Sequence, residues 1–125
     1  MTTWNLQETS CHLLICNGGS CMMRQAEEVT QAIRDEIALL GADKRIHTTR
    51  TRCNGRCADA CVVIAYPDGI WYKDISPESG RKIVRKHLVG KRLDEQIAYT
   101  FDHHFIASGR SVAGKEKIAG RPSLF

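Results

Sequence analysis

Six cysteines are the residues of this 125-residue chain whose type and spacing could do chemistry. Cys16 and Cys21 have four residues between them, and Cys53 and Cys57 have three. Two such pairs could supply four thiolates to a zinc ion or to two irons bridged by sulfide. A dithiol redox site normally has two residues between its cysteines, and no two cysteines here have that spacing. Spacing alone leaves zinc and iron–sulfur ligation open.

Glycines and arginines beside these cysteines bear on the same choice. Gly18, Gly19 and Gly55 would let backbone amides approach the sulfurs, and such hydrogen bonds raise the reduction potential of an iron–sulfur centre. Arg52 and Arg56 stand next to the second pair of cysteines. They could act in the same direction, or they could be ordinary exposed loop residues.

The other two cysteines, Cys11 and Cys61, are expected to have no ligand role. Cys61 stands at the start of a predicted strand, where we expect it to act as a small buried apolar residue. It follows Cys57 by four residues, so the spacing leaves open a role as a ligand in place of Cys57. Cys11 precedes the first predicted strand and is expected to be an ordinary surface or packed thiol.

The first half of the chain has a strand–helix–strand pattern. The apolar run 12–16 predicts a buried strand, and the residues NGGS at 17–20 predict a turn. Apolar residues then recur at helical spacing over 23–40, and 45–52 is rich in β-branched residues that favour a second strand. If the two strands are parallel, their ends meet at one edge of the sheet. Both cysteine pairs would then face each other there.

The second half predicts a hairpin followed by a helix. Strands are expected at 60–66 and 70–75, joined by a turn at Pro-Asp-Gly. Ser76 and the proline after it predict the start of a helix that ends at Gly90. This order indicates an α/β fold, a thioredoxin-like sandwich with a central mixed sheet of about four strands and two main helices.

Beyond that helix the pattern weakens. We expect a domain over 1–93 and a C-terminal extension over 94–125 that packs on it or trails from it. The stretch LDEQIAYTF, 93–101, is expected to be a short helix or an arm across the surface. The Gly-, Ser- and Lys-rich stretch that closes the chain is expected to be flexible or held by a partner.

Composition and charge limit the class of protein. The net charge is +4, yet no nucleic-acid-binding motif is present, so nucleic acid is not an expected partner. Residues 1–10 lack the basic start and apolar block of a secretory signal, and no apolar run is long enough to span a membrane. We therefore expect a cytoplasmic protein whose cysteines stay reduced and bind metal or do redox chemistry.

A histidine group offers a second candidate for metal binding. Asp102, His103 and His104 are consecutive, and His87 could join them. A short group of this kind in a polar tail is usually solvated or packed, and His87 lies on the apolar face of its predicted helix. We expect no metal there.

Several segments together resemble the thioredoxin-like [2Fe–2S] ferredoxins over about 12–93. They read CNGGSCMMRQAEEV, RCNGRC, VVIAYPDGIWYKDISPE and IVRKHLVGKRL, and the closing GRPSLF is also similar to that family's end. The resemblance implies that Cys16, Cys21, Cys53 and Cys57 bind one [2Fe–2S] cluster per chain, and that the chain forms a homodimer. The loop between the first two cysteines is shorter than is usual there. Cys61 stands where the family tends to have proline, and residues 94–118 have no clear family counterpart.

The resemblance also implies a function. It predicts a small soluble ferredoxin, not an enzyme, that carries single electrons between redox partner proteins and does not bind membranes. Relatives occur beside proteins of cobalamin or nitrogen-fixation pathways, so an iron–sulfur sensor or a cluster-delivery module is an alternative. A zinc-stabilised interaction module is the other alternative. It would give a colourless protein without sulfide.

Overall fold

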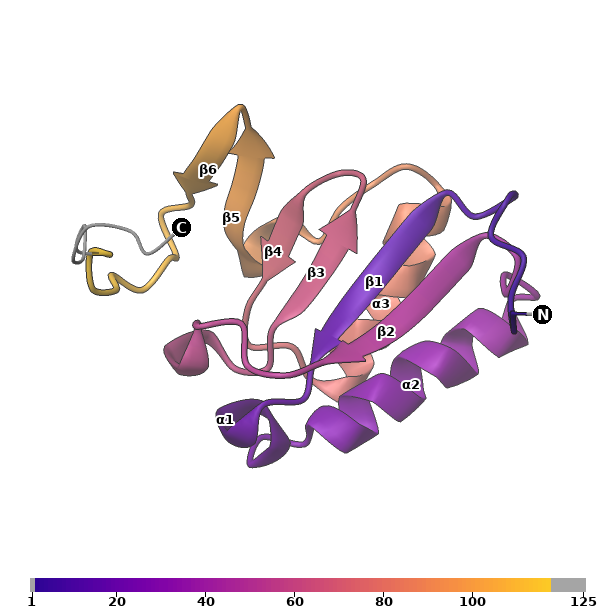
Figure 1. Cartoon of the computed structure of the whole chain (residues 1–125), viewed down its shortest axis with the longest axis horizontal. Helices are drawn as coiled ribbons and strands as arrows, with labels where there is room; N and C mark the ends of the chain where they lie inside the picture. Colours follow the sequence, from indigo (N-terminus) through magenta and orange to yellow (C-terminus); the bar gives the residue numbers. More distant parts are fainter. Residues whose placement is uncertain (1, 118–125) are drawn as a thin grey trace.

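The computed structural model describes residues 2–117 and places six strands in one sheet (Figure 1). The strands are β1 (Cys11–Cys16), β2 (Ile46–Thr51), β3 (Val63–Tyr66), β4 (Ile70–Tyr72), β5 (Ile97–Asp102) and β6 (His104–Ala107). Their order is β2-β1-β3-β4-β5-β6, with β1 and β2 parallel and the other neighbours antiparallel. The prediction of an α/β, thioredoxin-like mixed sheet is confirmed. The sheet has six strands, where about four were expected.

Three α-helices and two short 3₁₀ turns are the other elements of the described part of the chain. They are α1 (Gly19–Met22), α2 (Ala26–Leu39), η1 (Cys57–Asp59), α3 (Pro77–Leu88) and η2 (Asp94–Gln96). Ser76 caps α3 as predicted, since its side chain accepts a hydrogen bond from the Ser79 amide. The predicted start of α2 at position 23 is wrong, because Gln25 takes a left-handed φ of 70° that separates α1 from α2. Positions 19 and 20, predicted as turn, belong to α1.

Both long helices lie on the same face of the sheet. Arg34 of α2 donates to Thr48, which pairs with Leu13 in the sheet, and Tyr72 of β4 shares a hydrogen bond with His87 of α3. Leu13 is fully buried beneath the helices, and burial of a side chain of this size stabilises the fold by about 1.5 to 3 kcal/mol. Gly80 of α3 lets the two helices approach closely.

The opposite face of the sheet carries no helix among the described residues, and we call it the open face. The strand register aligns Leu14, Ile64, Trp71, Tyr99 and Ala107 in one row across it. Phe101 and Phe105 project from the same face. Phe105 packs edge-on against Trp71, Tyr99 and Phe101, with ring centroids 5.6, 6.3 and 5.4 Å away.

Residues 97–107 form a β-hairpin that extends the sheet beyond β4 (Figure 1). The prediction of a short helix or a surface arm over 93–101 is therefore wrong, apart from the single turn η2. Tyr99 and Phe101 alternate with the polar residues Thr100 and Asp102, and that period of two suits a strand. The closing GRPSLF segment lies outside the described residues.

Candidate metal centre

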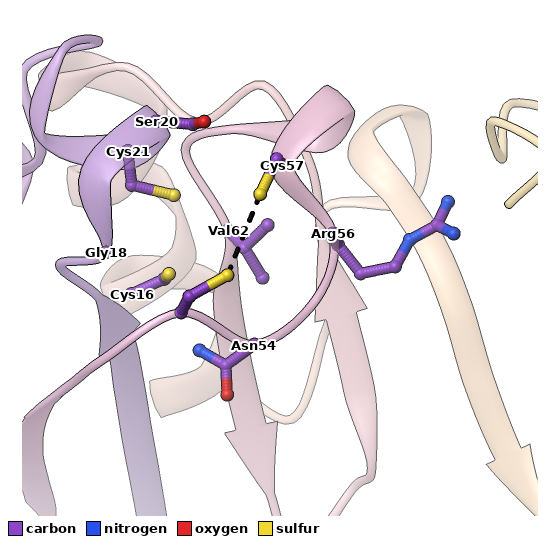
Figure 2. Close-up of a pocket in the computed structure, with 9 residues that line it drawn as sticks. Cys16, Gly18, Ser20, Cys21, Asn54, Arg56, Cys57 and Val62 are labelled. Atoms are coloured by element: carbon purple, nitrogen blue, oxygen red, sulfur yellow. Dashed lines mark hydrogen bonds between the residues drawn. The ribbon is translucent and has the colours of Figure 1, made fainter. Parts of the chain in front are cut away.

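Four of the six cysteines line one pocket at an edge of the sheet (Figure 2). Because β1 and β2 are parallel, both end at this edge. Cys16 ends β1, Cys21 lies in α1, Cys53 follows β2 and Cys57 begins η1. Figure 2 shows the sulfurs of Cys16, Cys21 and Cys57 directed into the same space. The structure thus brings together all four residues that the sequence singled out.

Gly18 permits the two cysteine-bearing loops to touch. A Cβ added at Gly18 would lie 2.7 Å from the Cα of Cys53, a distance too short for any side chain to occupy. The Asn17 amide also donates to the carbonyl oxygen of Thr51 at 2.8 Å, which ties the ends of β1 and β2 together. A glycine is required here because of this close approach, since its φ of −68° is open to any residue.

The thiols are arranged as two pairs. The sulfurs of Cys53 and Cys57 are 3.6 Å apart, and the Cys16 and Cys21 thiols are near enough for each to affect the pKa of the other. Within residues 2–117, no three His, Cys, Asp or Glu side chains are arranged to hold a single metal ion. A [2Fe–2S] core needs two thiolates for each of two irons, and the four thiols that line this pocket provide that number.

Backbone amides near the sulfurs favour negative charge there. The Gly55 amide donates to the Cys53 sulfur at 3.3 Å. Burial raises the pKa of the Cys16 thiol, but hydrogen bonds from Gly18, Cys21 and Asn54 outweigh it, so the pKa is lowered overall. Burial raises the pKa of the Cys21 thiol. A hydrogen bond from the Val62 amide lowers this pKa, but burial has the larger effect.

Arg56 lines the pocket with its stem, but its guanidinium points away from the sulfurs (Figure 2). It forms an ion pair at 2.7 Å with Asp59, whose side chain is only 1% exposed. Sequence reasoning did not identify Asp59. The one sequence signal for Asp59 was Arg56, three residues before it. The other cationic partner of Asp59, Lys73, is distant in sequence.

The two remaining cysteines are buried outside this pocket. The Cys61 thiol donates to the carbonyl oxygens of Arg24 at 2.9 Å and Cys21 at 3.4 Å. It therefore packs behind Cys21 as a small buried residue, as expected. Cys11 is at the other end of β1, where burial raises its pKa to about 11. Cys11 was expected to be either a surface thiol or a packed thiol, and it is packed.

The histidines predicted to be solvated or packed are spread over two sites. His103 is at the exposed tip of the β5–β6 hairpin, 3.7 Å from Asp102, and the His104 side chain bonds the Phe105 carbonyl. His87 is buried under the sheet between Tyr72 and Asp68.

Comparison with known proteins agrees with this geometry. The family model described as thioredoxin-like [2Fe–2S] ferredoxin matches residues 3–88. A protein of Priestia megaterium, named provisionally as a 2Fe-2S ferredoxin, is 48% identical over 122 residues, which cover 94% of this chain and 95% of that protein. A 2Fe-2S ferredoxin of Aquifex aeolicus (strain VF5) is 40% identical over 83 residues, covering 63% of this chain and 72% of the relative.

A solved structure supports the same assignment. The thioredoxin-like [2Fe–2S] ferredoxin from Aquifex aeolicus superimposes with a TM-score of 0.70 at 30% identity, covering 75% of this chain and 94% of that one. The fold and these relatives place the chain in the class of iron–sulfur electron carriers. The chain belongs to the thioredoxin-like [2Fe–2S] ferredoxins. A chain of this family carries a [2Fe–2S] cluster, and the described helices include none suited to crossing a membrane.

Proposed function

We propose that Cys16, Cys21, Cys53 and Cys57 bind one [2Fe–2S] cluster per chain, and that the chain acts as an electron carrier rather than an enzyme. The observation that supports this most directly is the meeting of two thiol pairs in one pocket at the ends of parallel strands. When bound, the cluster supplies a centre that takes up and releases a single electron.

The donor set fits that group. The chain provides four thiols, the amides of Gly18 and Gly55 beside them, and a glycine that keeps the two loops in contact. Cys16 and Cys21 are buried, whereas Cys53 and Cys57 are exposed. The exposed pair makes this side of the pocket the one that a redox partner can approach. The rigid sheet beneath limits rearrangement of the thiolates.

The test is a metal and sulfide count on anaerobically purified protein, with its visible spectrum. We expect two irons and two acid-labile sulfides per chain, a red-brown colour, and reversible bleaching by one electron. A colourless protein with one zinc and no sulfide would contradict the proposal.

We also propose a cellular location, a domain division and an oligomeric state for this carrier. We expect a cytoplasmic protein with redox partner proteins, in which residues 1–93 form the cluster-binding domain and 94–125 a C-terminal extension. We also expect a homodimer. The exposed aromatic side chains of the open face, Phe101 and Phe105, support a second copy packing on it.

A further inference from the structure

A buried ion-pair group lies directly beside the proposed cluster loop. Asp59 accepts hydrogen bonds from Arg56 on its Oδ2 atom at 2.7 Å. Its other oxygen, Oδ1, is 3.3 Å from the Lys73 ammonium, an ionic contact without hydrogen-bond alignment. The side chains of Asp59, Arg56 and Lys73 are 1%, 16% and 12% exposed. A buried carboxylate needs such partners, because an unpaired charge there is strongly unfavourable.

Both cations also hold the segment that follows the hairpin. Arg56 donates to the carbonyl oxygen of Val112, and Lys73 donates to that of Arg110 at 2.7 Å. The Arg56 guanidinium lies over the ring of Tyr99 in β5, 5.0 Å from its centroid. Gly114 is so near that a Cβ there would lie 3.1 Å from Nη1 of Arg56. These contacts join the C-terminal extension to the residue immediately before Cys57.

We infer that Arg56 and Lys73, joined at Asp59, latch the C-terminal segment 108–114 onto the Cys53–Cys57 loop, so that retention of the cluster depends on that segment. The family model ends at residue 88, so the latch lies partly outside it. Arg56 is thus a positioning residue that holds the Cys57 backbone through Asp59 and the segment, with its charge turned away from the sulfurs (Figure 2). The inference rests on the proposed ligand set.

The first test compares Arg56→Gln with Arg52→Gln in the full-length, cluster-loaded chain. Both changes remove one positive charge next to a proposed ligand, but the described contacts include no ion pair for Arg52. With excess chelator present, we expect Arg56→Gln to shorten the half-life of the visible absorbance about tenfold or more, and Arg52→Gln to leave it within about twofold. Because each variant removes one positive charge, equal shifts in reduction potential for Arg52→Gln and Arg56→Gln would agree with the latch, provided that only Arg56→Gln shortens the half-life. Equal half-lives for the two variants would overturn the latch.

The second test acts from the extension, away from the loop. In Gly114→Val the added Cβ would lie 3.1 Å from Nη1 of Arg56, whereas the Cβ of Gly109→Val would meet nothing within 4 Å. We expect only Gly114→Val to speed cluster loss and to increase hydrogen exchange at residues 108–114, with the exchange increase visible in the cluster-free chain as well. Identical behaviour of the two glycine variants would contradict the inference.

A Cys57→Ser variant separates the two proposals. Loss of the cluster in Cys57→Ser, together with equal decay of both arginine variants, would reject the latch and leave the ligand set standing. Retention of an unchanged cluster in Cys57→Ser would reject the ligand set. Hydrogen exchange in the cluster-free Arg56→Gln chain would still decide whether the segment is latched.

Discussion

At the scale of single residues, Gly18 is the position where the smallest change should matter most. Gly18→Ala adds one carbon against the Cys53 backbone, which must shift because its Cα would be 2.7 Å away. We expect a loss of about 1 to 3 kcal/mol in stability and a lower iron content. Gly19→Ala is the matched control, since nothing lies within 4 Å of that added carbon. Thermal unfolding and an iron count measure both effects. Equal tolerance of the two alanines would contradict the close-contact explanation.

The cysteines themselves give the second residue-scale prediction. Serine at Cys16, Cys21, Cys53 or Cys57 should abolish or alter the two-iron spectrum, because an alkoxide is a poorer ligand for iron than a thiolate. Cys61→Ser should be mild, since a hydroxyl can still donate to the Arg24 carbonyl. Spectra and iron-to-protein ratios of the five variants would measure this, with the buried Cys11→Ser as control. Loss of the cluster in Cys61→Ser with retention in Cys57→Ser would reverse their assigned roles.

At the scale of elements, α3 is fastened to β4 by a buried histidine. His87 contacts the Tyr72 hydroxyl at 2.7 Å and the Asp68 carboxylate at 3.1 Å, and the Leu93 amide donates to the same hydroxyl. Burial lowers the pKa of His87 below its usual 6.5, against the opposing pull of Asp68. The folded chain therefore binds fewer protons than the unfolded chain between the lowered pKa and 6.5. Stability from this residue is complete above 6.5 and falls as the pH drops through that window.

The corresponding prediction concerns the pH dependence of unfolding. Between pH 7.5 and 5.5, the melting temperature of the native chain should fall further than that of His87→Gln, which cannot titrate. His103→Gln is the control, because the His103 side chain is 95% exposed. Circular dichroism melts at the two pH values measure the difference. An unchanged pH dependence in His87→Gln would show that the histidine does not contribute.

The elements also show what could be predicted from the sequence. The meeting of Cys16 with Cys53 followed from two parallel strands, a local pattern with a general geometric consequence. The β5–β6 hairpin was missed because its tip is His103 at a φ of 63°, with no Asn-Gly or Asp-Gly to signal a turn. The Asp59 latch could not be foreseen either. Lys73 approaches Asp59, and Val112 approaches Arg56, only through the tertiary fold.

At the scale of the whole molecule, charge offers little guidance to a partner. The formal net charge is +4, but a bound [2Fe–2S] cluster with its four thiolates is an anion, so the loaded chain is closer to neutral. Long-range steering is therefore weak and strongly screened at physiological salt. Recognition of another protein or another copy must depend mainly on shape and apolar contact.

The open face is the surface best suited to a second copy. Phe101 and Phe105 are 52% and 47% exposed, and the row from Leu14 to Ala107 contains no Lys, Arg, Asp or Glu, so the contact between two copies there would be mainly apolar. We expect the chain to sediment at twice its 14.0 kDa at micromolar concentration, and Phe105→Ser to shift it toward one chain. Val89→Ser is the matched control, because Val89 is 67% exposed at the end of α3, away from the open face. Two results would contradict a dimer through the open face. The native protein could sediment as a single chain at these concentrations, or Phe105→Ser could leave the dimer unchanged.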